Sequence, residues 1–249
     1  MRVQSLIVAI AAAGMLGGCG QRGLEAYHKY DLGESEPAVS AAVEFLGGIQ
    51  AWNAVSSVSA DAVMTLYDER GQAYVNSQLH RIDVNGGKLT IRAATPQEGW
   101  TAVYNRNRDS FWLFGASGLG RITRERLCDT MAILSHRLAG PLNLLGKDER
   151  PEDVSRVTIG GKDLVRVSVG GKKPEATAYY FSADGGELDM VTAGPEKPGE
   201  GGTVTTYTYH MLQDGMVFPK TIRVVKTGTY MLVGRSPVME VEYSNVHIN

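Results

Sequence analysis

The sequence is poor in cysteine and histidine, and this scarcity excludes several kinds of catalytic centre. Its 249 residues include two cysteines and five histidines. The histidines are scattered, and none has a metal-binding spacing such as H-E-x-x-H. Two cysteines cannot build a Cys-type zinc site. The chain also has no G-x-S-x-G motif and no phosphate-binding P-loop. We therefore expect no catalytic residues, no metal and no cofactor.

A strong net charge is also absent. The whole chain carries 25 basic and 27 acidic residues. Loss of the leader described below would remove Arg2, which leaves 24 basic against 27 acidic residues and a net charge of −3. Nucleic-acid-binding proteins need a basic footprint. The composition therefore excludes nucleic acid as a partner.

The apolar run near the N-terminus is too short to cross a membrane. Residues 6–16 form a stretch of 11, whereas a membrane-spanning helix needs about 20. The stretch follows the basic Arg2 and ends in small residues, which is the pattern of a secretory signal. The alternative is a buried N-terminal helix, but such a helix would normally show a polar face.

The end of this leader, Leu16-Gly17-Gly18-Cys19, resembles the bacterial lipobox. The resemblance implies a lipoprotein signal peptide over residues 1–18, diacylglyceryl attachment to Cys19, and N-acylation by a chain such as palmitate. Glycine rather than aspartate at position 20 favours the outer membrane of a bacterial cell envelope, facing the periplasm. Several acyl chains on one cysteine give durable anchoring. The alternative is an incidental cysteine in a Gly-rich cleavage region.

The mature chain divides into a tether and one domain. Residues 19–35 are polar and lack periodicity, so they read as a lipidated tether. Residues 36–249 form the domain. Lipidated Cys19 cannot pair with Cys128, which is then expected to be a lone thiol hidden in a core.

Two helices are predicted from apolar residues at helical spacing. The first covers residues 36–52, with Gly47-Gly48 as a point where it would break. The second lies within residues 122–142 and ends at Gly140-Pro141. It carries an apolar stripe at i, i+4, i+7 and i+11, formed by Leu127, Met131, Leu134 and Leu138.

Strands are predicted on both sides of the second helix, where apolar and polar residues alternate. The first group has five segments with short connections, which favours an antiparallel meander: 57–67, 73–83, 88–94, 100–105 and 109–114. The second group is 154–161, 163–171, 176–183, 187–193, 203–212, 218–226, 229–234 and 238–248. A bulge near Ser244-Asn245 would reconcile the two halves of the last segment. About a dozen strands in one sheet must curl, close or split.

A set of apolar residues is the best candidate for a binding site. We predict that they line a concave face, because a curled sheet that does not close leaves an apolar groove. The alternative is that they form ordinary core. The set is Met64, Leu66, Val75, Leu79, Leu89, Ile91, Val165, Val167 and Tyr180 from the strands, with Leu127, Met131 and Leu134 from the second helix.

Several segments together resemble the Lol-type lipoprotein carrier and receptor superfamily, the LolA/LolB-like proteins. The segments are "FLGGIQAW", "VSSVSADAVMTLYD", "QLHRIDVNGGKLTIR" and the closing "MVFPKTIRVV" and "VMEVEYSNVHIN". The resemblance implies a mainly β (α+β) fold, namely a single antiparallel, curled, incompletely closed β-barrel of about 11 strands lidded by two helices. Its apolar cavity would accept acyl chains and would hold no catalytic residues.

The chain departs from that family in two respects. A soluble periplasmic carrier would lack Cys19, so anchoring fits a receptor or a lipid-handling lipoprotein better. A lipoprotein-inserting receptor is also expected to carry a protruding apolar loop. Residues 112–119 are the one candidate, and the alternative is that they are the end of a strand.

Three hypotheses for the function follow. The leading one is a membrane-anchored lipoprotein that binds or transfers lipid or lipoprotein acyl chains. The second is a non-catalytic periplasmic scaffold with a filled barrel and another envelope protein as its partner. The third is an enzyme, which would require His80, Asp83 or His210 to cluster in one pocket.

Overall fold

A computed structural model describes residues 36–94, 99–115, 122–145, 151–170, 177–194, 201–212, 214–228 and 233–249. The predicted signal peptide, Cys19 and the tether lie outside these residues. The helices are α1 (Glu36–Phe45), α2 (Ile49–Ala54) and α3 (Arg124–Ala139), with short 3-10 helices η4 (Arg106–Arg108) and η6 (Gly140–Leu145). None of the described helices is long and apolar enough to cross a membrane.

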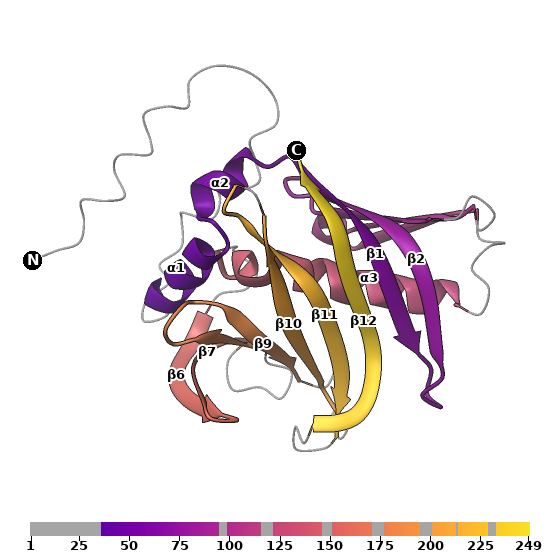
Figure 1. Ribbon diagram of the computed structural model, residues 1–249. Coiled ribbons are helices and arrows are strands. Elements are labelled where there is room, and N and C mark those ends of the chain that lie inside the picture. Colours follow the sequence, from indigo (N-terminus) through magenta and orange to yellow (C-terminus); the bar gives the residue numbers. More distant parts are fainter. Residues whose placement is uncertain are drawn as a thin grey trace, which may run out of the picture.

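The strands of the described chain form one antiparallel sheet of twelve (Figure 1). They are β1 (Ser57–Tyr67), β2 (Ala73–Asp83), β3 (Lys88–Ala93), β4 (Thr101–Asn105), β5 (Ser110–Phe114), β6 (Pro151–Ile159), β7 (Lys162–Val169), β8 (Thr177–Ser182), β9 (Leu188–Ala193), β10 (Thr203–Met211), β11 (Val217–Thr227) and β12 (Val233–Ile248).

The sheet consists of two meanders joined through the middle. Its order is β5-β4-β3-β2-β1-β12-β11-β10-β9-β8-β7-β6, so β1 and β12 pair in the centre and β5 and β6 are the edges. The mainly β, antiparallel prediction is confirmed. The expected barrel of about 11 strands is corrected to an open sheet of twelve, which is not closed into a barrel.

The predicted bounds hold best where the pattern is local. The segments 57–67 and 73–83 coincide with β1 and β2. The structure does not show residues 233–234 as the end of a separate strand. Val233 is instead the first residue of the single strand β12. Residues 229–232 lie outside the described residues.

The first predicted helix is broken in two. Gly47 and Gly48 have φ angles of 107° and 85°, which glycine adopts without strain. A Cβ atom at Gly47 would lie 3.0 Å from the backbone Cα of Met216. The break therefore lets the corner between α1 and α2 pack closely against the turn between β10 and β11.

The predicted bulge in the last strand is confirmed. The pairing of β1 with β12 shifts between Ser59 and Asp61. Asn245 has a φ of 48° there, and its Nδ2 donates to Asp61 Oδ2 at 2.7 Å. Asparagine tolerates this left-handed conformation better than most residues.

Helix α3 lies across the hollow side of the sheet (Figure 1). Thr123 caps its start, where Oγ1 accepts a hydrogen bond from the Arg126 backbone N–H at 3.2 Å. Its buried stripe consists of Leu127, Thr130, Met131, Leu134 and Arg137. Cys128 lies beside this stripe and is half-buried rather than hidden in the core.

Candidate functional site

The predicted apolar set mostly gathers on one side of the sheet. Eight of its members have exposed fractions of at most 3%: Met64, Leu66, Leu89, Ile91, Leu127, Met131, Leu134 and Val167. Val165 is partly buried against the same core. These nine residues form a continuous apolar layer between the inner face of the sheet and α3.

The structure places the other three residues on the outer face. Val75 is 62% exposed. Leu79 shares its parity along β2 and pairs with Asp61 and Arg92. Tyr180 lies between Tyr179 and Phe181 along β8, and it is these two neighbours that face the core. Side chains alternate between faces along a strand, so these three residues do not join the inner layer.

A chain of polar side chains occupies part of the inner face instead. Tyr243 donates its hydroxyl to His80 Nδ1 at 3.1 Å, and His80 Nε2 lies 2.7 Å from Gln78 Oε1. The amide of Gln78 reaches Met64 Sδ at 3.8 Å. A neutral His80 protonated on Nε2 satisfies each contact. Burial lowers the pKa of His80 to about 3 and raises the pKa of Tyr243 far above its ordinary value.

The residues that would support an enzyme are not brought into one pocket. Both ring nitrogens of His80 are engaged as described. Asp83 Oδ1 accepts from the Gly86 N–H at 2.7 Å in the turn after β2. His210 Nε2 lies 3.0 Å from the backbone oxygen of Tyr243. Within the described ranges, no group of three His, Cys, Asp or Glu side chains could hold a metal ion.

Two small cavities lie where the helices meet the sheet. The larger, of about 60 Å³, is lined by residues that include Ile82, Leu89, Leu138 and Leu142. The smaller, of about 20 Å³, lies beside Tyr207 and Tyr209. Both cavities are bordered by the same four side chains, namely Trp52, Leu138, Leu142 and Phe218.

Trp52 is the wall residue supplied by the short helix α2. Its indole Nε1 donates to the Leu46 carbonyl at 3.0 Å, and 6% of the residue is exposed. The turn at Gly47 and Gly48 sets the position of α2. Trp52 therefore borders both cavities from the helix side.

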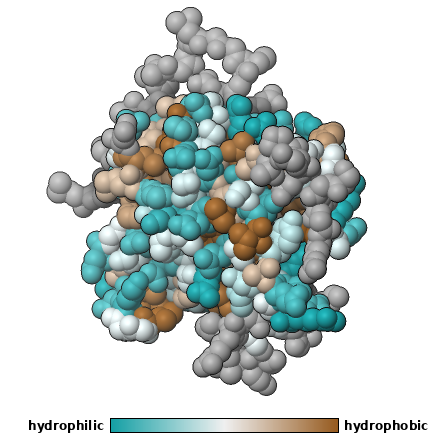
Figure 2. Space-filling view, turned by 45° about the vertical axis from the view of Figure 1, so that its right-hand side comes forward, coloured by the Kyte–Doolittle hydropathy of each residue, from teal (hydrophilic) through white to brown (hydrophobic). Residues whose placement is uncertain are grey.

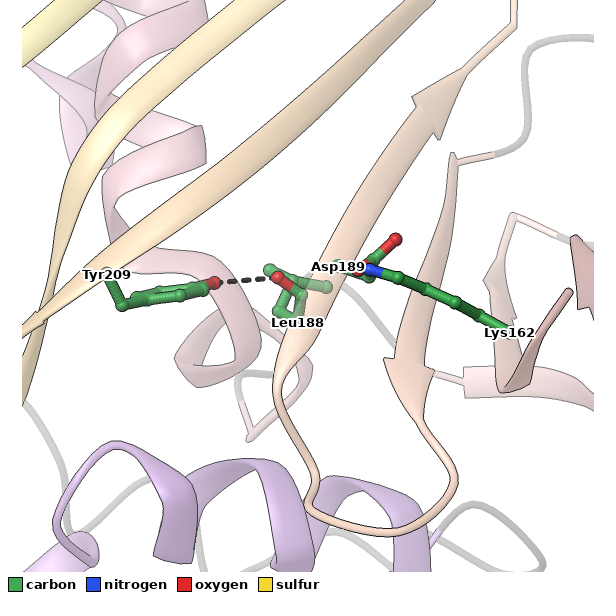
Figure 3. Close-up of polar contacts among 4 residues, drawn as sticks. All are labelled: Lys162, Leu188, Asp189 and Tyr209. Atoms are coloured by element: carbon green, nitrogen blue, oxygen red, sulfur yellow. Dashed lines mark hydrogen bonds and ion pairs between the residues drawn. The ribbon is translucent and has the colours of Figure 1, made fainter. Parts of the chain in front are cut away.

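Aromatic residues of β10 complete the wall of the smaller cavity. Tyr207 and Tyr209 stack with ring centroids 6.1 Å apart, and Phe45 of α1 packs edge-on against Tyr209 at 5.2 Å. Tyr209 donates its hydroxyl to the Leu188 carbonyl at 2.9 Å (Figure 3). Burial raises the pKa of Tyr209 well above its ordinary value. An ion pair lies beside this contact (Figure 3). Its two atoms, Lys162 Nζ and Asp189 Oδ1, are 2.6 Å apart.

The outer surface carries apolar side chains in small, separated patches (Figure 2). Trp112 and Phe114 are 43% and 60% exposed on the edge strand β5. They lie in the segment 112–119, the candidate for a protruding loop, and its first three residues are the end of strand β5. Residues 116–119 of that segment lie outside the described residues.

Comparison with solved structures places this architecture among known folds. No protein-family model matches the sequence, and no curated protein does. A LolA superfamily protein from Nitrosomonas europaea is similar to the chain, with 11% identity, coverage of 86% of this chain and 93% of that one, and a TM-score of 0.52. The chain has a LolA-like fold.

Two further structures share the LolA-like fold of this chain. A domain from Vibrio parahaemolyticus assigned to outer membrane lipoprotein sorting has 11% identity and a TM-score of 0.53, with coverage of 87% of this chain and 94% of that one. A DUF1329 family protein from Desulfovibrio piger has 12% identity and a TM-score of 0.55, with coverage of 86% and 92%. The resemblance found in the sequence is therefore confirmed at the level of fold.

Proposed function

We propose that the chain is a cell-envelope lipoprotein that binds or passes on a lipid or acyl chain in the apolar interior between its sheet and its helices. The observation that carries the proposal is a LolA-like fold in which an apolar layer lies between the inner face of the sheet and α3. Cys19, once lipidated, would anchor the domain to the outer membrane, facing the periplasm. The proposal assigns no catalytic residue, metal or cofactor.

The volume of the cavities sets how such binding would occur. The larger cavity, of about 60 Å³, is far below the roughly 300–1,000 Å³ of ordinary ligand pockets. An acyl chain therefore needs the helices to separate from the sheet, and α2 with Trp52 is the short element that borders both cavities. Each methylene buried contributes about 0.8 kcal/mol. An acyl chain gains about the same free energy per methylene in a bilayer. Its transfer between the bilayer and the protein would therefore be nearly balanced in free energy and reversible.

Residues 20–249, produced without the leader and Cys19, should carry lipid visible by native mass spectrometry and should take up a fluorescent fatty acid. Ala139→Leu should lower the affinity for that probe by about tenfold, since the added methyl groups occupy the larger cavity. Ala73→Leu on the exposed start of β2 is the matched control and should bind as the unaltered chain does. Equal binding by both variants would place the ligand elsewhere.

The second candidate is a non-catalytic scaffold whose partner is another envelope protein. The small volume of the two cavities favours it, because a filled interior leaves nothing to hold a ligand. A bare polypeptide in native mass spectrometry, together with no probe uptake, would support this candidate over lipid binding.

A further inference from the structure

Arg137 is a buried cation whose Nε lacks a hydrogen-bond partner among the residues that the structure describes. It is 9% exposed and continues the buried stripe of α3 one turn beyond Leu134. The ion pairs formed among the described residues join other side chains, as in Lys162–Asp189 and Arg223–Glu240.

Such a side chain is costly to bury. A guanidinium keeps its charge in a protein. Burial of an unpaired charge is strongly unfavourable. The last turn of a helix does favour a cation through the helix dipole. That effect leaves the donor at Nε unsatisfied, so helix stability alone does not account for a buried arginine at this position.

Arg137 lines the smaller cavity, and it is the one charged side chain among the described residues of that lining. The hydroxyl of Tyr209 is committed to the Leu188 carbonyl, and that of Tyr207 lies 3.5 Å from the Arg137 carbonyl. The remaining wall is mostly apolar, and through Trp52 and Phe218 it adjoins the larger cavity. The larger cavity is mostly apolar and also has Asp83, Lys88 and Arg106 in its lining. Arg137 therefore supplies a cationic donor at the end where the smaller cavity lies.

We propose that Arg137 binds the anionic headgroup of a single-chain amphiphile whose tail enters the adjoining apolar cavity. A carboxylate or a phosphate can accept two parallel N–H bonds from a guanidinium. The inference rests on the proposed lipid-binding function and narrows its ligand class. The acyl chains of a mature lipoprotein are esters and amides without charge, so Arg137 favours a free anionic lipid over a lipoprotein.

The test compares headgroups on one chain length. Palmitate, hexadecanol and 1-palmitoyl lysophosphatidic acid compete with the fluorescent fatty acid on residues 20–249. The unaltered chain should bind at least one of the two anions about tenfold or more tighter than hexadecanol. The tighter of the two anions identifies the headgroup. Equal affinities for all three ligands would overturn the role of Arg137 while leaving lipid binding intact, and no binding of any ligand would reject both proposals.

Arg137→Met should remove the preference for the anions and leave hexadecanol affinity within about twofold. Arg137→Lys should keep part of the preference, because it keeps the charge but not the fork of donors. Arg124→Met, at the exposed start of the same helix, is the control and should behave as the unaltered chain does. Unchanged binding of the preferred anion by Arg137→Met would overturn the inference.

Thermal melting of the ligand-free protein separates this role from a structural one. Arg137→Met should raise Tm by about 2–4 °C, because it removes a buried charge whose Nε lacks a hydrogen-bond partner among the described residues. A structural arginine would instead lower Tm on replacement, and that result would count against the inference. If Arg137→Met fails to fold, the affinities of the unaltered chain for the two anions and for hexadecanol still test the inference.

Discussion

Strand β2 reverses the usual amphipathic pattern of a half-buried strand. It buries Gln78 and His80 and exposes Val75. Apolar residues normally mark the buried face, so local alternation assigns Val75 and Leu79 to the cavity. The polar face is stabilised by Tyr243, which lies 163 residues after His80. A partner at that distance cannot be read from a local pattern, and this is why part of the site was assigned to the wrong face.

Arg137 was missed for a different reason. An arginine in the last turn of a helix is the residue type that the helix dipole favours at the surface. Its spacing from Leu134 and Leu127 continues the buried stripe, and that spacing was the one signal in the sequence. The predicted stripe ends at Leu138 and does not include Arg137.

His80 should make stability depend on pH. Burial lowers its native pKa to about 3, whereas an unfolded histidine has a pKa near 6.5. Below pH 6.5 the unfolded chain takes up a proton that the folded chain does not. The free energy of unfolding is therefore intact above pH 6.5 and falls as the pH drops toward 3, by about 2 kcal/mol between pH 7 and pH 5.

Urea unfolding at several pH values measures this contribution. His80→Gln should be less stable than the unaltered chain at pH 7, because the hydrogen bonds to Tyr243 and Gln78 change. Its stability should fall less steeply between pH 7 and pH 5. Parallel pH profiles for the two proteins would show that His80 is not the group responsible.

At the scale of elements, the strands with short local connections were predicted best. β1 and β2 follow from period-two alternation and a tight turn between them. The apolar spacing of residues 36–52 continues through Ile49 and predicts one helix, with Gly47-Gly48 marking a break or close packing within it. The break depends on the approach of Met216, a residue far along the chain, and local spacing contains no sign of that contact.

Gly47→Ala should destabilise the protein by about 2–4 kcal/mol, since it combines left-handed backbone strain with a clash against Met216. Gly71→Ala is the matched control. Gly71 has a φ of 74° with no atom within 4 Å of an added Cβ, so its cost should be about 1–2 kcal/mol, from backbone strain alone. Urea unfolding compares the two, and equal losses would mean that the α1–α2 corner is not tightly packed.

The whole molecule is organised around a pairing that spans most of the chain. Val58 of β1 pairs with Ile248 of β12, and each meander extends outward from that centre. Consecutive antiparallel strands could be predicted from short turns. The central pairing could not, because no turn joins those two strands. The LolA-like resemblance supplied the overall shape instead, although it implied about 11 strands rather than the twelve described.

Backbone protection should follow this order. Amides of β1, β11 and β12 each lie between paired strands and pack under the core, so they should exchange slowest with deuterium. Edge strands β5 and β6 pair on one side only and should exchange at least about tenfold faster. Hydrogen exchange followed by mass spectrometry measures this, and uniform protection across the sheet would contradict it.

The position of β12 has a consequence for a shortened chain. Loss of β5 or β6 would make the neighbouring strand, β4 or β7, the new edge of the sheet. Loss of β12 would instead open a slot in the middle, with the bare backbones of β1 and β11 facing each other across it. An unpaired edge is a template for a strand from another molecule. The 16 residues of β12 are therefore the natural donor segment for strand exchange between copies, and proteolytic removal of them would create the acceptor.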